Sequence, residues 1–129
     1  MAYPEAWLRS AIELATGRSA YPVLAPKSAA LPYIVFGRNS TDRESVLVGG
    51  STFPVGSFEV DVFAGSYTEA KALADLVRIG VHGFNGTASG VTITQSLLRD
   101  EADGDPIVFD GQDVPTYSVS HTYAIRWSE

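Results

Sequence analysis

The stretch from Phe58 to Gly83 constrains the fold most, because it joins a strand pattern to a helix pattern through a very short connection. Phe58 to Phe63 alternates apolar and acidic residues, which is typical of a half-buried strand. Ser66 and Glu69 have the spacing of a capping box at a helix start. The residues that then repeat at helical spacing are Ala70, Leu73, Ala74, Val77 and Val81. We predict that this strand and helix pack face to face and form the core.

The remaining patterns predict one more helix and three more strands. Tyr3–Ala15 has proline at its first helical position, an apolar stripe and a closing glycine at Gly17, which together indicate a helix. The further predicted strands are Tyr33–Arg38, Val91–Leu98 and Thr116–Trp127. We therefore expect a single α+β domain over residues 1–129. Its antiparallel sheet of about four strands would carry the N-terminal helix and the central helix on one face.

Four connections separate these elements. Residues 18–32 contain three prolines, which favours an ordered, extended connection. Asp42–Gly56 is a long polar excursion with room for a short strand at Val46–Val48, and Phe84–Gly90 is predicted to be a turn. Arg99–Val114 is rich in carboxylates and is predicted to be a solvated turn or an interaction loop. Loops as long as the 42–56 excursion usually have a task.

Composition excludes several classes of protein. The formal net charge of −6 disfavours binding to phosphate backbones, which requires clustered Lys and Arg. The chain has no cysteine, so disulfides and thiolate metal sites are excluded. No apolar run approaches the roughly 20 residues that span a bilayer, and we expect no membrane partner.

The residues give little support for an enzyme. The acidic segment Asp100–Asp113 does not match the ligand spacing of a calcium loop, which favours a solvated turn or an interaction loop over the alternative of a specific cation site. His82 and His121, the only histidines, are interpreted as structural, and a pocket around His121, Tyr117 and Tyr123 would be the only basis for a small ligand-binding or catalytic site. We predict no catalytic residue, no metal site and no cofactor.

Three segments in this order resemble a known family. They are Tyr21–Val35 with its Pro-rich beginning, Phe58–Ala64 running into Tyr67–Ala74, and Gly90–Ile93 followed by an acidic loop and an aromatic-rich last strand. Together with the N-terminal helix they are similar to the tail-completion, or tail-terminator, proteins of bacteriophages with long non-contractile tails. These are minor tail proteins of the virion. The resemblance extends from about Leu8 to Trp127.

The resemblance implies a structural protein rather than an enzyme. Such terminators form a ring, usually of six copies, on the head-proximal end of the tail tube, where they stop tube polymerisation. They also provide the docking surface for the head connector. The implied partners are further copies of the chain, the tail tube protein and the connector, with DNA passing through the ring without specific binding. The implied location is the virion tail, reached after assembly in the host cytoplasm.

Two sets of residues follow as hypotheses from this resemblance. Subunit and tube contacts are assigned to the two long connections, at Arg43, Glu44, Val46, Val48, Phe53, Asp103, Asp105 and Phe109. A negative channel wall that repels DNA phosphates is assigned to Glu59, Asp61, Asp100 and Glu101. The alternatives are a neck protein that joins head to tail without limiting tube growth and, from another class, a small ligand-binding domain.

Overall fold

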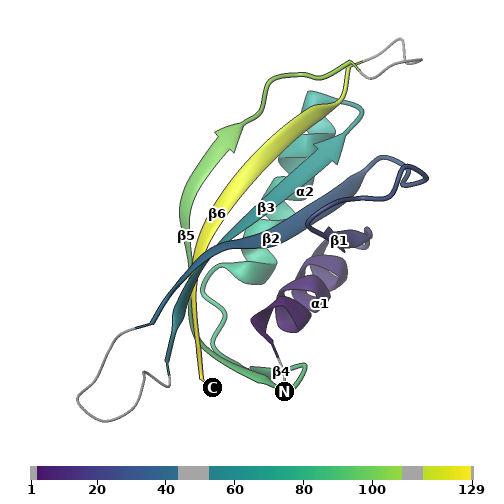
Figure 1. The fold of residues 1–129 in the computed structure, drawn as a ribbon. Coiled ribbons are helices and arrows are strands. Elements are labelled where there is room, and N and C mark those ends of the chain that lie inside the picture. The colour runs from purple at the N-terminus through teal and green to yellow at the C-terminus, as the bar shows by residue number, and fades with distance from the viewer. Residues whose placement is uncertain (1–2, 44–52, 109–114, 129) are drawn as a thin grey trace.

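A computed structural model describes residues 3–43, 53–108 and 115–128, which form two helices and six strands (Figure 1). The helices are α1 (Pro4–Thr16) and α2 (Tyr67–Val81). The strands are β1 (Ala20–Pro22), β2 (Tyr33–Asp42), β3 (Val55–Ala64), β4 (Gly86–Ala88), β5 (Val91–Asp103) and β6 (Tyr117–Ser128). Neither helix of this described part is both long and apolar enough to cross a membrane.

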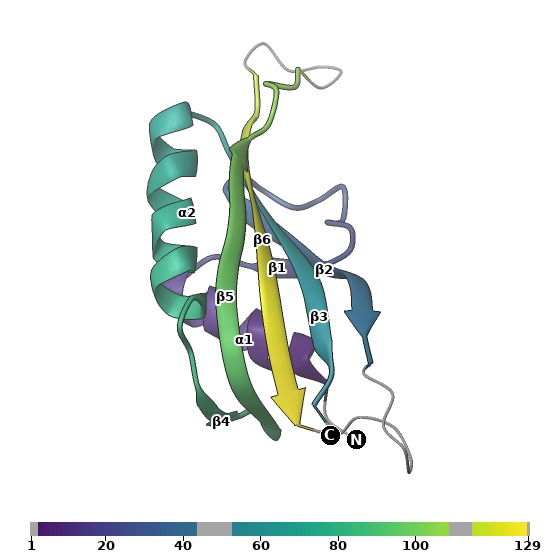
Figure 2. The same cartoon turned by 90° about the vertical axis from the view of Figure 1, so that its left-hand side faces the viewer.

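The sheet is mixed and has six strands, in the order β1-β2-β3-β6-β5-β4. The predicted four-stranded antiparallel sheet is therefore wrong in strand number and in type. β1 runs parallel to β2, with Ala20 opposite Ile34, whereas all other neighbours are antiparallel. The sheet twists and curves into a half-barrel (Figure 2).

Three short or extended pieces account for this difference. β1 lies in the Pro-rich segment that we expected to remain a connection, and three residues are too few to show a period in sequence. β4 lies in the expected turn, where Ser89 and Gly90, both with positive φ, close a tight hairpin onto β5. β5 continues through Arg99–Asp103, which we expected to be a loop, because its pairing with β6 is preserved across a bulge.

Both helices lie against the same face of the sheet and form the core with it. Every second side chain of β3 and β6 points toward the helices and is buried. Trp7, Leu8 and Ile12 of α1 join the apolar stripe of α2 in one cluster. Trp127, an aromatic residue near the end of the chain, also belongs to this core and is only 2% exposed.

A local signal marks one end of each helix. The Ser66 hydroxyl accepts a hydrogen bond from the Glu69 amide over 3.2 Å, which confirms the predicted N-cap. Gly17 ends α1 in the left-handed conformation, with φ of 68°. The helices cross at Gly80, where an added Cβ would lie 2.7 Å from the Ala15 Cβ, so the crossing requires glycine.

Candidate interaction surfaces

One face of the sheet packs against both helices, and no helix of the described chain covers the other. We call this second face the open face. The side chains of β3 that point to it, including Glu59 and Asp61, are only partly buried. They alternate with the fully buried Phe58, Val60 and Val62. On β6 the open face carries small polar side chains, among them Ser120 and Thr122.

Glu59 and Asp61 form an acidic pair at the middle of the open face. The Ser120 hydroxyl donates a hydrogen bond to Asp61 from the neighbouring strand, and Asn39 donates one to Glu59 from the other side. The negative charge of Asp61, followed by burial, raises the pKa of Glu59, and the Asn39 hydrogen bond opposes that shift. Two like charges held this closely give the face a negative centre.

The other two residues of the predicted channel wall lie on opposite faces of the sheet. Asp100 pairs with Thr122 and so lies on the open face, with Glu59 and Asp61. Glu101 pairs with His121 and belongs to the helix-covered side, where its Oε2 lies 2.6 Å from Nε2 of His121. The bulge between Leu98 and Asp100 shifts the alternation, which no sequence pattern revealed.

Glu101, whose side chain is 38% exposed, forms the outer end of a network whose inner members are buried under α2. Nδ1 of His121 lies 2.8 Å from the Tyr123 hydroxyl, and both residues are fully buried. Burial lowers the pKa of His121, while the hydrogen bond and charge of Glu101 oppose that shift; Arg78 adds to the lowering and Asp75 opposes it. Burial and the Glu101 charge raise the pKa of Tyr123.

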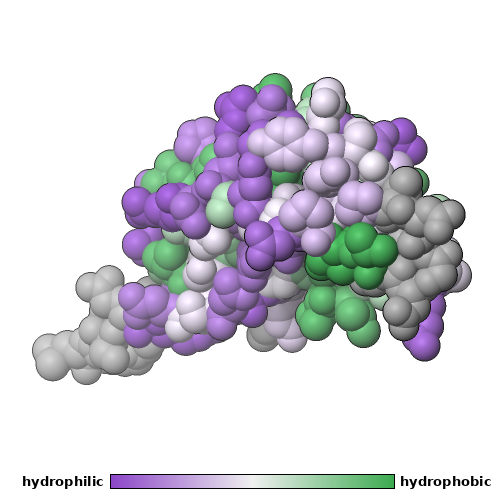
Figure 3. Space-filling view, turned by 90° about the horizontal axis from the view of Figure 1, so that it is seen from above, coloured by the Kyte–Doolittle hydropathy of each residue, from purple (hydrophilic) through white to green (hydrophobic). Residues whose placement is uncertain are grey.

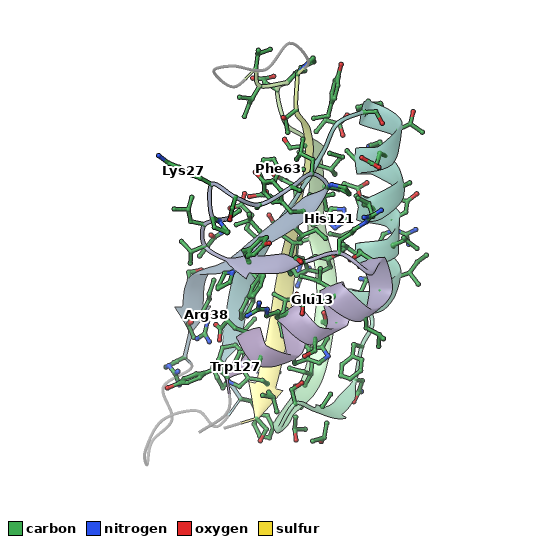
Figure 4. All side chains as sticks on the ribbon, turned by 90° about the vertical axis from the view of Figure 1, so that its right-hand side faces the viewer. Glu13, Lys27, Arg38, Phe63, His121 and Trp127 are labelled. Atoms are coloured by element: carbon green, nitrogen blue, oxygen red, sulfur yellow. The ribbon has the colours of Figure 1, made fainter. Side chains whose placement is uncertain are left out.

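This burial removes the basis for a catalytic or ligand pocket around His121, Tyr117 and Tyr123. The ring of His121 has no exposed surface and lies between the sheet and α2, with Glu101 at its outer nitrogen (Figure 4). Among the described residues no group of three or more His, Cys, Asp and Glu side chains is arranged to hold a metal ion.

The predicted contact residues have different surroundings. Asp103 is held by α2, because its carboxylate accepts hydrogen bonds from Tyr67 over 2.7 Å and from Lys71 over 3.0 Å. These two bonds lower the pKa of Asp103. Arg43, Phe53 and Asp105 are exposed. Glu44, Val46, Val48 and Phe109 lie outside the described residues.

Sequence reasoning missed Arg38, which ties the N-terminal helix to the sheet. Its guanidinium donates to Glu5 of α1 over 2.6 Å and stacks over the ring of Trp127 at 4.7 Å from the centroid (Figure 4). A second ring, that of Phe58, lies 5.3 Å away. Arg38 continues the alternation of the buried Ile34 and Phe36 and lies opposite Phe58 on the helix side of the sheet, so alternation indicated its face but not its partners.

Sequence reasoning also missed an apolar groove at one end of the open face. The groove has a volume of about 860 Å³ and lies between the 23–31 segment, the paired ends of β2 and β3, and Ile107. The 23–31 segment leaves β1 and arches over the sheet on the side opposite α2 (Figure 2). Val23 and Leu24, both 81% exposed, line the groove with Leu31 and Phe63. The 23–31 segment contains several small residues and a proline, a composition that gave no indication of a groove.

Comparison with known proteins gives the family. The model of a family described as tail completion protein gp17 matches residues 6–112. No curated protein matches the chain. One similar solved structure is a chain of the virion of a native gene transfer agent particle. It is 17% identical, with 92% of this chain and 84% of that chain covered and a TM-score of 0.66.

A second solved structure is 14% identical over the whole of this chain and 98% of the other, with a TM-score of 0.54. At these identities the structural comparisons establish the fold, whereas the family match covers most of the sequence. The chain belongs to the tail completion protein gp17 family and is a structural, non-enzymatic component of a bacteriophage-type tail.

Proposed function

We propose that this protein forms a ring of six copies on the head-proximal end of the tail tube, stops tube polymerisation there and presents the docking surface for the head connector. The observation that carries the proposal is the division of the sheet into two faces. One face is filled by the helices, and the other is open, partly polar and negative at Glu59 and Asp61. A structural protein whose sheet leaves one face uncovered has that surface available for assembly.

The charge of the open face suits a channel that passes DNA. Glu59, Asp61 and Asp100 lie on this one face, and the chain as a whole has a net charge of −6. A negative wall repels phosphates and keeps the genome from adhering during passage. In this arrangement the ring contacts come from the two connections that carry Arg43, Phe53 and Asp105. The ring is assembled in the host cytoplasm before it joins the tail.

The ring also requires two different surfaces on each copy. A closed ring is built from heterologous contacts, in which one patch of a copy meets another patch of its neighbour. The two ends of the sheet differ in this chain: one carries the apolar groove, and the other carries the connection between Asp42 and Val55. This asymmetry is what a head-to-tail contact between copies needs.

Electron microscopy of particles assembled with the gene disabled tests the proposal. We expect abnormally long tubes without heads, and normal tails when the wild-type gene is supplied from a plasmid. Tails of normal length beside full, unattached heads would refute tube termination and favour the head–tail joining role. Intact virions would refute both roles.

The channel assignment has its own test in the same system. The double variant Glu59→Gln/Asp100→Asn, whose two positions lie on the open face outside the groove, should still cap tubes, since it changes charge at little cost in volume, but its virions should eject DNA more slowly. Asp75→Asn, on the exposed side of α2, is the control and should eject at the wild-type rate. Wild-type ejection by the double variant would show that this pair does not line the channel.

A further inference from the structure

The groove on the open face has the properties of a docking site for an apolar segment. Its rim includes Val23 and Leu24, which are among the most exposed large apolar residues of the described chain, together with Ile107 at 43% exposure. Figure 3 looks onto this end of the molecule and shows hydrophobic surface beside polar surroundings. Monomeric proteins seldom expose clustered apolar side chains of this size without a partner.

The backbone around Val23 is built to present these side chains. Val23 has φ of 65°, a conformation that β-branched residues rarely adopt. It is the centre of a tight turn in which the Leu24 amide donates to the Pro22 carbonyl over 2.6 Å. The Val23 amide donates to Phe36 of β2 over 2.7 Å and so anchors the turn to the sheet. Strained backbone of this kind is concentrated at functional sites, where it positions a surface.

The chain contains one apolar segment that fits this groove. Val46-Leu47-Val48 lies in the middle of the otherwise polar connection between β2 and β3. Glu44 precedes it by two residues, and Lys27 lies on the groove at the outer end of the 23–31 segment (Figure 4). The segment and the groove are therefore complementary in hydrophobicity, and Glu44 is opposite in charge to Lys27, while Asp61, which also lines the groove, has the same sign as Glu44.

A copy cannot place this segment in its own groove. The groove lies at the end of the β2–β3 pair where Tyr33 faces Phe63, whereas the connection leaves the opposite end, where Asp42 faces Val55. These ends are roughly 30 Å apart along the strands. The connection has about twelve residues, so going out and back it reaches at most about 20 Å from its stem. Its partner groove must belong to another copy.

We propose that Val46-Leu47-Val48 of one copy docks into the groove formed by the 23–31 segment, β2, β3 and Ile107 of the next copy. The inference rests on the proposed function, because it supplies the head-to-tail contact of the ring. It goes beyond that function in assigning both halves of the contact to named residues. Contacts of this heterologous kind close into a ring when the rotation between copies permits it.

Two single variants and their mixture test the contact. Leu24→Asp disables the groove and leaves the segment intact, whereas Leu47→Asp disables the segment and leaves the groove intact. Each purified full-length variant, one of them labelled with ¹⁵N, is analysed by native mass spectrometry alone and after mixing. Leu14→Asp is the matched control, since Leu14 is 89% exposed on α1, on the helix side of the sheet. Circular dichroism confirms that all variants melt as the wild type does.

The proposal predicts a distinctive pattern. The wild type and Leu14→Asp self-associate, and each groove or segment variant self-associates at least tenfold more weakly. The mixture forms one-to-one heterodimers that grow no further, because each pair retains one intact groove and one intact segment. Wild-type association of Leu24→Asp would overturn the assignment and leave the groove to another partner, such as the tube protein.

Two further outcomes would also overturn it. One is a mixture that stays monomeric while the wild type associates. The other is a wild type that remains monomeric up to about 1 mM, where even a millimolar contact is substantially populated. The proposed function is tested by a separate result. Normal particles from the disabled gene refute the terminator role whatever the mixture does, and long tubes without heterodimers refute only this contact.

Discussion

The crossing of the two helices at Gly80 gives the sharpest test of the packing, because two opposing terms have known sizes. Gly80→Ala adds a methyl group inside α2, which favours the helix by about 1 kcal/mol. The new Cβ, however, would lie 2.7 Å from the Ala15 Cβ, closer than carbon atoms approach without displacement. Both atoms are attached to helix backbones, so the helices must separate, and overpacking of this kind costs about 1–3 kcal/mol. We expect a net loss of about 1 kcal/mol in the free energy of unfolding.

A double-mutant cycle isolates the clash. Ala15→Gly alone should cost about 1 kcal/mol through helix propensity. The double variant Gly80→Ala/Ala15→Gly should return close to wild-type stability, because it removes one methyl group from α1 and adds one to α2 at the same contact. The coupling energy between the two positions should then reach about 1–3 kcal/mol.

Urea denaturation followed by circular dichroism measures all four proteins, with the slope m checked for constancy. Gly65→Ala is the control, since an added Cβ there meets nothing within 4 Å; it should leave stability unchanged or raise it by about 0.5 kcal/mol. A Gly80→Ala variant that is more stable than the wild type, or two single effects that simply add, would refute the close crossing.

Three further predictions concern the core and its polar groups. Arg38→Met loses the Glu5 hydrogen bond and the stacking on Trp127, and should lower the free energy of unfolding by about 2 kcal/mol in urea titrations; wild-type stability would show that the cluster is incidental. Because burial lowers the pKa of His121, the unfolded chain takes up its proton more readily, so stability should decline as pH falls below about 6.5. His121→Gln should flatten that decline in urea midpoints measured between pH 7 and about 5, and an unchanged slope would contradict the assignment. Val60→Asp buries an unpaired charge at a position with no exposure, costs several kcal/mol and should yield no folded protein by circular dichroism; a folded, soluble variant would contradict the core.

The parts of the fold that were predictable from sequence are those with a repeated period. The strand Phe58–Phe63 and the helix after it are present at the expected positions, since alternation and helical spacing each extend over several residues. Thr116–Trp127 is equally regular, and its apolar positions are buried. Period and capping are local signals, and local signals specify single elements well.

The sheet itself could not be predicted in the same way, because its extra strands depend on their neighbours. β1 and β4 each have three residues, and each exists only because a longer strand offers a free edge for pairing. Arg99–Asp103 has the composition of a loop but is held in the sheet by β6. Tertiary pairing overrides local propensity in such segments.

The candidate surfaces were predictable only in part, for the same reason. Alternation along β3 indicated that Glu59 and Asp61 share a face, and they do. Asp100 and Glu101 are adjacent and therefore point to opposite faces in any strand, but which of them faces the helices depends on the bulge between Leu98 and Asp100, and the groove depends on a turn at Val23 with positive φ. Neither the bulge nor the turn could be predicted from the types of residue at these positions.

The uneven coverage of the sheet edges has a consequence for how the molecule opens. β4 pairs with only Val91–Ile93 of β5, and β1 pairs with only Ile34–Phe36 of β2, so the far halves of β5 and β2 each have one strand neighbour. Local stability follows such coverage, and amide hydrogens in Arg99–Asp103 should exchange with solvent through local opening. The amides of β3 and β6, which have neighbours on both sides, should exchange only when the whole domain unfolds. The molecule therefore combines a rigid centre with two compliant ends that lie on opposite sides of the sheet, and adjustment to a partner at either end leaves the centre unchanged.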